Sequence, residues 1–144
     1  MVVRDELAAY TAAEYHVYGA KPIVLRMGYS EQVACWLDSL DAYLAFVIPV
    51  INGPRPRDER NSLQHRLVEA AQGAGLRWTA AQVVDPTGEM PTGESICVFD
   101  APLALIDEWL RYFDQKTVLQ ASGSGNVSWR LHPDERTLEP HSFF

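Results

Sequence analysis

Apolar and polar residues follow two periods along this chain, one of about 3.6 residues and one of two residues. Segments with the longer period have apolar side chains three or four positions apart and predict amphipathic helices. They cover residues 4–14, 31–41 and 58–74. A fourth predicted helix begins with Asp100 or Ala101 as its cap and Pro102 in its first turn. Its apolar stripe consists of Leu103, Ile106, Leu110 and Phe113.

The remaining apolar runs are short, rich in β-branched residues and bounded by turn residues, which is typical of strands. The most apolar run, Tyr43–Ile51, predicts a buried strand that ends at the Asn52-Gly53-Pro54 turn. Pro49 lies inside this run and predicts a bulge or a sheet edge there. Ser122–Asn126 predicts a hairpin turn between the last two strands. The predicted strands are Tyr15–Tyr18, Pro22–Met27, Tyr43–Ile51, Leu76–Val84, Ser95–Phe99, Thr117–Ala121 and Val127–Leu131.

This order of elements contains more strand-to-strand hairpins than parallel crossovers. It predicts an α+β fold, a two-layer sandwich with a mainly antiparallel or mixed β-sheet and with the helices packed on one face. The chain of 144 residues is long enough for one domain with its own core. We assign residues 1–132 to this domain and residues 133–144 to a C-terminal tail.

Composition narrows the class of protein. Apolar residues make up 47% of the chain and charged residues 22%, a balance typical of globular domains. The formal net charge of −7 argues against nucleic-acid binding, which needs clustered cations. No segment has the length of apolar sequence that a membrane span needs, and the first residues do not form a signal peptide. We therefore expect a cytoplasmic protein.

The side chains that commonly perform catalysis or bind metals are scattered. Cys35 and Cys97 lack metal-ligand spacing and are expected to be small buried hydrophobic residues. The four histidines occur in four different segments, without the spacing of a metal site. Ser95 has no Gly-x-Ser-x-Gly environment. The sequence therefore predicts no metal and no cofactor, and it shows no catalytic motif.

Four polar residues stand out because each lies where a strand meets a turn: Arg26, Asn52, Glu94 and Gln115. If neighbouring strand ends bring them together, they form a polar cluster at one edge of the sheet. Glu94 is then the candidate acid or base, Arg26 an anion clamp, and Asn52 and Gln115 positioning groups. The alternative is that these residues only cap turns and helix ends.

Several motifs follow one another in a fixed order along the chain, at Tyr10–Val17, Leu25–Gly28, Asn52, Asn61, Glu94, Ser95, Phe113 and Gln115. In the order of these motifs, the chain resembles the bacterial family of domains of unknown function numbered 3293. The resemblance extends over about residues 8–132. It implies an α+β fold and ligand-binding roles for Asn52, Asn61 and Gln115, and it implies no activity.

Two functions follow as hypotheses. The first is a small non-catalytic binding or regulatory domain that acts through a small molecule or a protein partner. Four aromatic residues at positions that look exposed support an interface: Trp36, Trp109, Phe143 and Phe144. The second is an enzyme for a small molecule that uses the strand-end cluster around Glu94.

Overall fold

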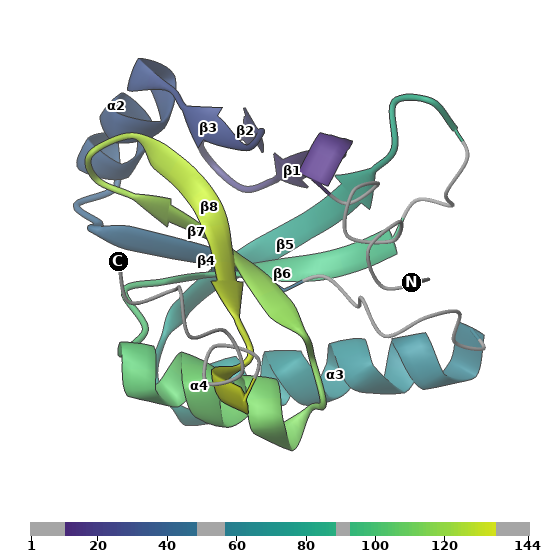
Figure 1. Cartoon of the computed structure of the whole chain (residues 1–144). Helices are drawn as coiled ribbons and strands as arrows, with labels where there is room; N and C mark the ends of the chain where they lie inside the picture. The colour runs from purple at the N-terminus through teal and green to yellow at the C-terminus, as the bar shows by residue number, and fades with distance from the viewer. Residues whose placement is uncertain (1–10, 49–56, 89–92, 135–144) are drawn as a thin grey trace.

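A computed structural model describes residues 11–48, 57–88 and 93–134, with the backbone alone for residues 57, 58, 60 and 61. These residues form three helices and eight strands (Figure 1). The helices are α2 (Glu31–Ser39), α3 (Arg57–Gly73) and α4 (Leu103–Tyr112). The strands are β1 (Glu14–Val17), β2 (Ile23–Leu25), β3 (Gly28–Tyr29), β4 (Leu44–Val47), β5 (Arg77–Val84), β6 (Gly93–Phe99), β7 (Thr117–Ser122) and β8 (Asn126–Leu131).

All eight strands belong to one sheet, in the order β2-β1-β5-β6-β4-β7-β8-β3. Each neighbouring pair is antiparallel. The α+β class and the antiparallel character of the sheet are therefore confirmed. The short β3 was not predicted as a separate strand. The chain bends between Leu25 and Gly28, where Gly28 has a φ of 110°, a conformation that favours glycine.

The sheet is strongly curled. In a flat sheet β1 and β8 are five strand spacings apart, which corresponds to about 24 Å. Here the rings of Tyr15 on β1 and Trp129 on β8 lie 5.9 Å apart, edge to face. The indole N–H of Trp129 also donates to Thr11 Oγ1 at 3.0 Å, next to the start of β1. The sheet is therefore a half-barrel whose two margins meet through side chains.

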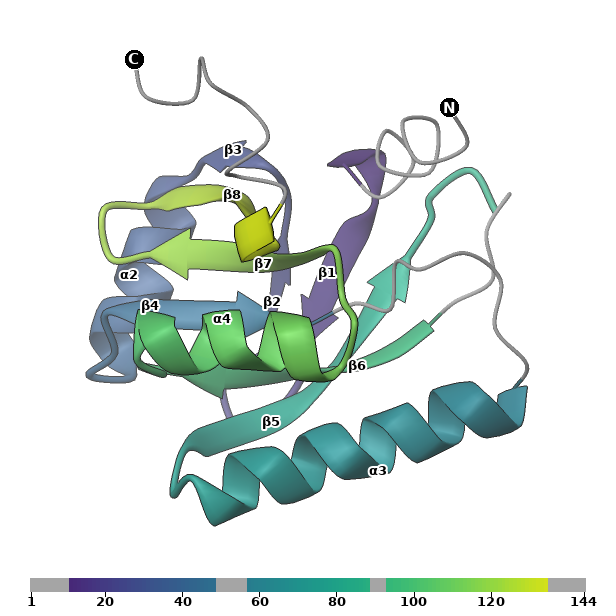
Figure 2. The same cartoon turned by 60° about the horizontal axis from the view of Figure 1, so that its bottom comes forward.

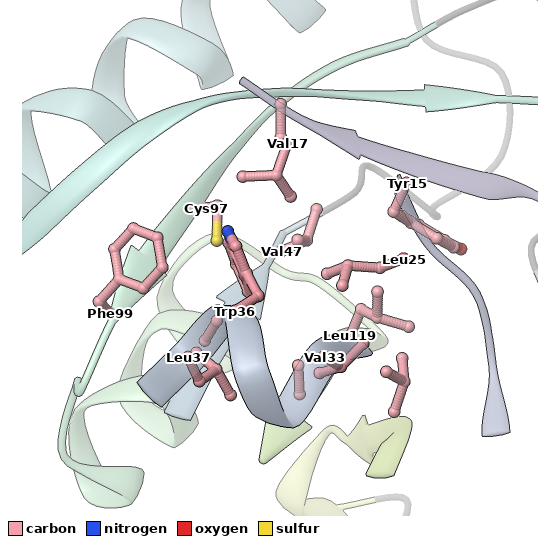
Figure 3. Packing of buried hydrophobic residues seen from close by; sticks show 14 of the residues in the cluster. Tyr15, Val17, Leu25, Val33, Trp36, Leu37, Val47, Cys97, Phe99 and Leu119 are labelled. Atoms are coloured by element: carbon pink, nitrogen blue, oxygen red, sulfur yellow. The ribbon is translucent and has the colours of Figure 1, made fainter. Parts of the chain in front are cut away.

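The concave face of this half-barrel is filled by α2 (Figure 3). Val33, Trp36 and Leu37 of α2 are buried there against strands from both halves of the sheet. Small side chains of the sheet, among them Ala45, Ala81 and Ala121, belong to the same buried cluster as Trp36. Trp36 packs on Phe99 at a ring distance of 5.6 Å and donates its indole N–H to Lys21 O at 2.8 Å.

The convex face carries α3 and α4, which lie on the outside of the sheet in Figure 2. Leu67 of α3 and Ile106 and Leu110 of α4 pack there against Phe46 and Val98 of the central strands. Helices therefore cover both faces, and the prediction of two layers with helices on one face is wrong. The central strands β4 and β6 are buried on both faces, which is why they read as continuous apolar runs.

Several local predictions need correction. Cys97 is buried as expected, but Cys35 is exposed on α2. Pro102 is itself the N-cap residue of α4, and the Asp100 carboxylate instead accepts hydrogen bonds from the backbone N–H groups of Tyr43 and Leu44 at 2.7 and 3.0 Å. Among the described residues, no helix is long and apolar enough to cross a membrane.

Candidate functional site

The antiparallel register places the predicted strand-end residues at one end of the sheet. Cys97 and Leu119 both lie opposite Val47, on either side of β4. Glu94 precedes Cys97 by three residues and Gln115 precedes Leu119 by four, so both lie towards the same end. Their strands are separated by β4 alone, which puts the two backbones about 10 Å apart. Arg26 follows Leu25 of β2, which pairs with Tyr15 near the start of β1, and it also lies at this end.

Arg26 is paired with another acid. Its guanidinium donates to the Glu14 carboxylate, which also contacts Nε2 of His16 at 3.1 Å. The hydrogen bond from Arg26, and after it the one with His16, hold the pKa of Glu14 below its usual range. Arg26, directly after β2, thus forms an exposed ion pair with Glu14 of β1. Among the described residues, its guanidinium forms no contact with Glu94 or Gln115.

The other predicted residues are spread as well. Glu94 is exposed on β6, opposite Gln82 of β5, whose side chain accepts a hydrogen bond from the Tyr18 hydroxyl at 2.6 Å. Asn52 lies outside the described residues. Asn61 belongs to α3, and only its backbone is described. Of the predicted site residues, Gln115 is therefore the one whose described neighbours could form a binding site.

Gln115 follows the C-terminus of α4 in a Schellman motif. Its backbone N–H donates to Leu110 O at 2.9 Å, and the preceding Asp114, at φ 52°, donates to Arg111 O at 3.2 Å. The same pair of hydrogen bonds ends α2 at Ala42 and α3 at Leu76. An apolar side chain usually packs at this position, and Ala42 and Leu76 fit the rule. Gln115 is the polar exception of the three.

The Gln115 side chain is almost fully buried, with 1% of its surface exposed. Its Nε2 donates to Phe113 O at 3.1 Å, which fixes the orientation of the amide. Its Oε1 is also buried and has no hydrogen-bond partner among the described residues. A buried acceptor without a partner costs about 1–3 kcal/mol, so this atom is expected to have a partner outside those residues.

Gln115 also lines a hollow of about 240 Å³ at the end of the β7–β8 ladder, which we call the polar hollow. The ladder is extended at this point by the His132 N–H, which donates to Lys116 O at 2.7 Å. One side of the hollow thus comes from the α4–β7 connection and the other from the end of β8. Its lining residues are Asp114, Gln115, Lys116, His132 and Asp134.

The geometry of His132 defines one donor in the polar hollow. The backbone N–H of Asp134 donates to Nδ1 of His132 at 3.0 Å. A backbone N–H can only donate, so Nδ1 is the acceptor and the ring proton is on Nε2. The Asp134 carboxylate lies 3.9 Å from the same Nδ1, beyond hydrogen-bonding distance. His132 therefore presents an N–H through Nε2.

The strands beneath the polar hollow are held by a partly buried ion pair. Arg130 on β8 forms two hydrogen bonds, of 3.0 and 2.9 Å, with the carboxylate of Asp107 on α4. Only 18% and 20% of these two side chains are exposed. The Thr117 hydroxyl donates to Arg130 O at 2.9 Å. These contacts fix α4, β7 and β8 relative to one another. Thr117 and Arg130 are two residues from Gln115 and His132, respectively.

A second hollow, of about 360 Å³, lies on the convex side between α3 and α4. It is mainly apolar and is lined by Ala70, Glu108, Trp109, Tyr112 and Phe113. The Arg66 guanidinium already covers two of these rings, at 5.6 Å from the centre of Tyr112 and 5.2 Å from that of Phe113. Among the described residues that line this second hollow, no buried polar side-chain atom lacks a hydrogen-bond partner. The second hollow therefore offers no unsatisfied group that a ligand would pair with.

The aromatic residues predicted to be exposed are largely buried. Trp36 and Trp109 expose 7% and 8% of their surface, while Phe143 and Phe144 lie outside the described residues. The sequence prediction also missed His132 and Asp134 as neighbours of Gln115. The sequence does contain a signal that Gln115 is unusual. The residue at the same position after the other two helices is apolar, Ala42 after α2 and Leu76 after α3, whereas after α4 it is the amide Gln115.

Comparisons with known proteins do not assign the chain to a family. No protein-family model, no curated protein and no solved structure matches the chain. The resemblance to the family of domains numbered 3293 therefore stays a prediction. Among the described residues, no group of three or more His, Cys, Asp or Glu side chains is placed to hold a metal ion.

Proposed function

We propose that this protein is a small ligand-binding domain and that its binding site is the polar hollow. The observation that carries the proposal is that Gln115, a residue of this hollow's lining, has a buried Oε1 without a partner among the described residues. A bound molecule that donates a hydrogen bond to this oxygen removes its desolvation cost, and this gain becomes part of the binding free energy.

Binding without catalysis agrees with the chemistry of the lining. His132 and Asp134 are the two neighbours that suggest an acid–base pair, but Nδ1 of His132 is engaged by the Asp134 backbone and not by its carboxylate. Gln115 neither gains nor loses a proton, so it can orient a ligand but cannot act as a base. The lining is therefore suited to recognition, which a regulatory domain also requires.

The alternative of an enzyme built on Glu94 has less support. That role needs a concave setting that perturbs the carboxyl group. Glu94 is exposed, and Arg26, its expected anion-binding neighbour, is occupied by Glu14. The described residues thus supply no acid–base site around Glu94, and binding at the polar hollow is the better-supported function.

The test is native mass spectrometry of the untagged protein purified gently from its own host. Wild-type protein should carry a defined small-molecule adduct, and the variant Gln115→Met should lack it. Gln120→Met is the matched control, because Gln120 is a partly buried glutamine on β7 that does not line the hollow. Wild-type protein without an adduct, or an adduct retained by Gln115→Met, would contradict the proposal.

A further inference from the structure

We draw no further inference here: the strongest candidate, the part of the convex face formed by β2, β1 and β5, where Val24, Trp78 and the adjoining Tyr18 are exposed, carries no proposal because nothing in the structure shows what covers it.

Discussion

Replacing Gln115 by methionine should stabilise the ligand-free protein. This is unusual for a change at a residue with 1% of its surface exposed, because most buried substitutions destabilise a protein. The wild-type side chain buries Oε1 without a partner among the described residues. The proposed binding site accounts for its presence, because residues kept for binding often reduce stability.

The expected magnitude follows from three contributions. Removing an unpartnered buried acceptor recovers about 1–3 kcal/mol, and losing the hydrogen bond from Nε2 to Phe113 O costs about 0.5–1.5 kcal/mol. Methionine is unbranched and close to glutamine in size, so it fills the same space with little change in packing. The free energy of unfolding should therefore rise by about 1 kcal/mol.

The assay is urea unfolding of protein that has been unfolded, dialysed and refolded, because a retained ligand would stabilise the wild type alone. The transition midpoint should increase at an unchanged slope with denaturant concentration. Gln120→Met, the control on β7, should change stability by less than about 0.5 kcal/mol. A loss of about 1 kcal/mol in Gln115→Met would show that Gln115 is a structural residue, and the reasoning would be refuted.

Three further predictions concern other parts of the molecule. Asp41 and Asp100 have similar left-handed backbones, at φ 52° and 55°. Asp41→Gly should stabilise the protein by about 0.5–1 kcal/mol, because glycine adopts this backbone without strain. Asp100→Gly should destabilise it by about 2 kcal/mol, because the two hydrogen bonds from the backbone N–H groups of Tyr43 and Leu44 are lost. Equal effects of the two substitutions in urea unfolding would contradict this reasoning. Arg26→Gln should raise the pKa of Glu14 towards the ordinary value of a glutamate, as measured by NMR titration. Because a lowered folded-state pKa stabilises the protein above the unfolded value, wild-type protein should lose this contribution as the pH falls through the lowered pKa, and an unchanged Glu14 titration in the variant would refute the pairing. Native protein should react with a thiol reagent at the exposed Cys35 only, since burial raises the pKa of the Cys97 thiol, and denatured protein should react at both; two rapid equivalents in native protein would contradict the packing of β6.

The sequence predicts the described helices α2, α3 and α4 and all described strands except the short β3, because each of them has a local signal. Most of the predicted helix over residues 4–14 lies outside the described residues. Gly75 follows the C-terminus of α3 in a left-handed conformation at φ 70°, which favours glycine, so the end of this helix has a local signal. The hairpin between β7 and β8 is also confirmed. The placement of the helices on the two faces of the sheet is harder to predict from the sequence. Apolar periodicity shows that a strand is buried, but it does not identify the element that covers it. The uninterrupted apolar runs of β4 and β6 are the sequence signal for cover on both faces.

The candidate site shows the same limit. Gln115 was selected because an amide follows a helix and precedes a strand, which is a local observation. Its neighbours His132 and Asp134 follow from the pairing of β7 with β8, which joins Thr117 to Leu131. Glu94 and Arg26 do lie at the same end of the sheet, but their partners are set by individual side-chain contacts. Arg26 pairs with Glu14 because β1 and β2 form a hairpin, and no sequence motif predicts that contact.

The most direct test of the polar hollow as a ligand site is a crystal structure of the untagged protein purified from its own host. Our account predicts electron density for a small molecule in the hollow, with a donor about 2.7–3.2 Å from Gln115 Oε1. The contrary result is an Oε1 that accepts its hydrogen bond from the chain itself, for example from Asn52. In that case Gln115 completes the fold, and the polar hollow is not a binding site.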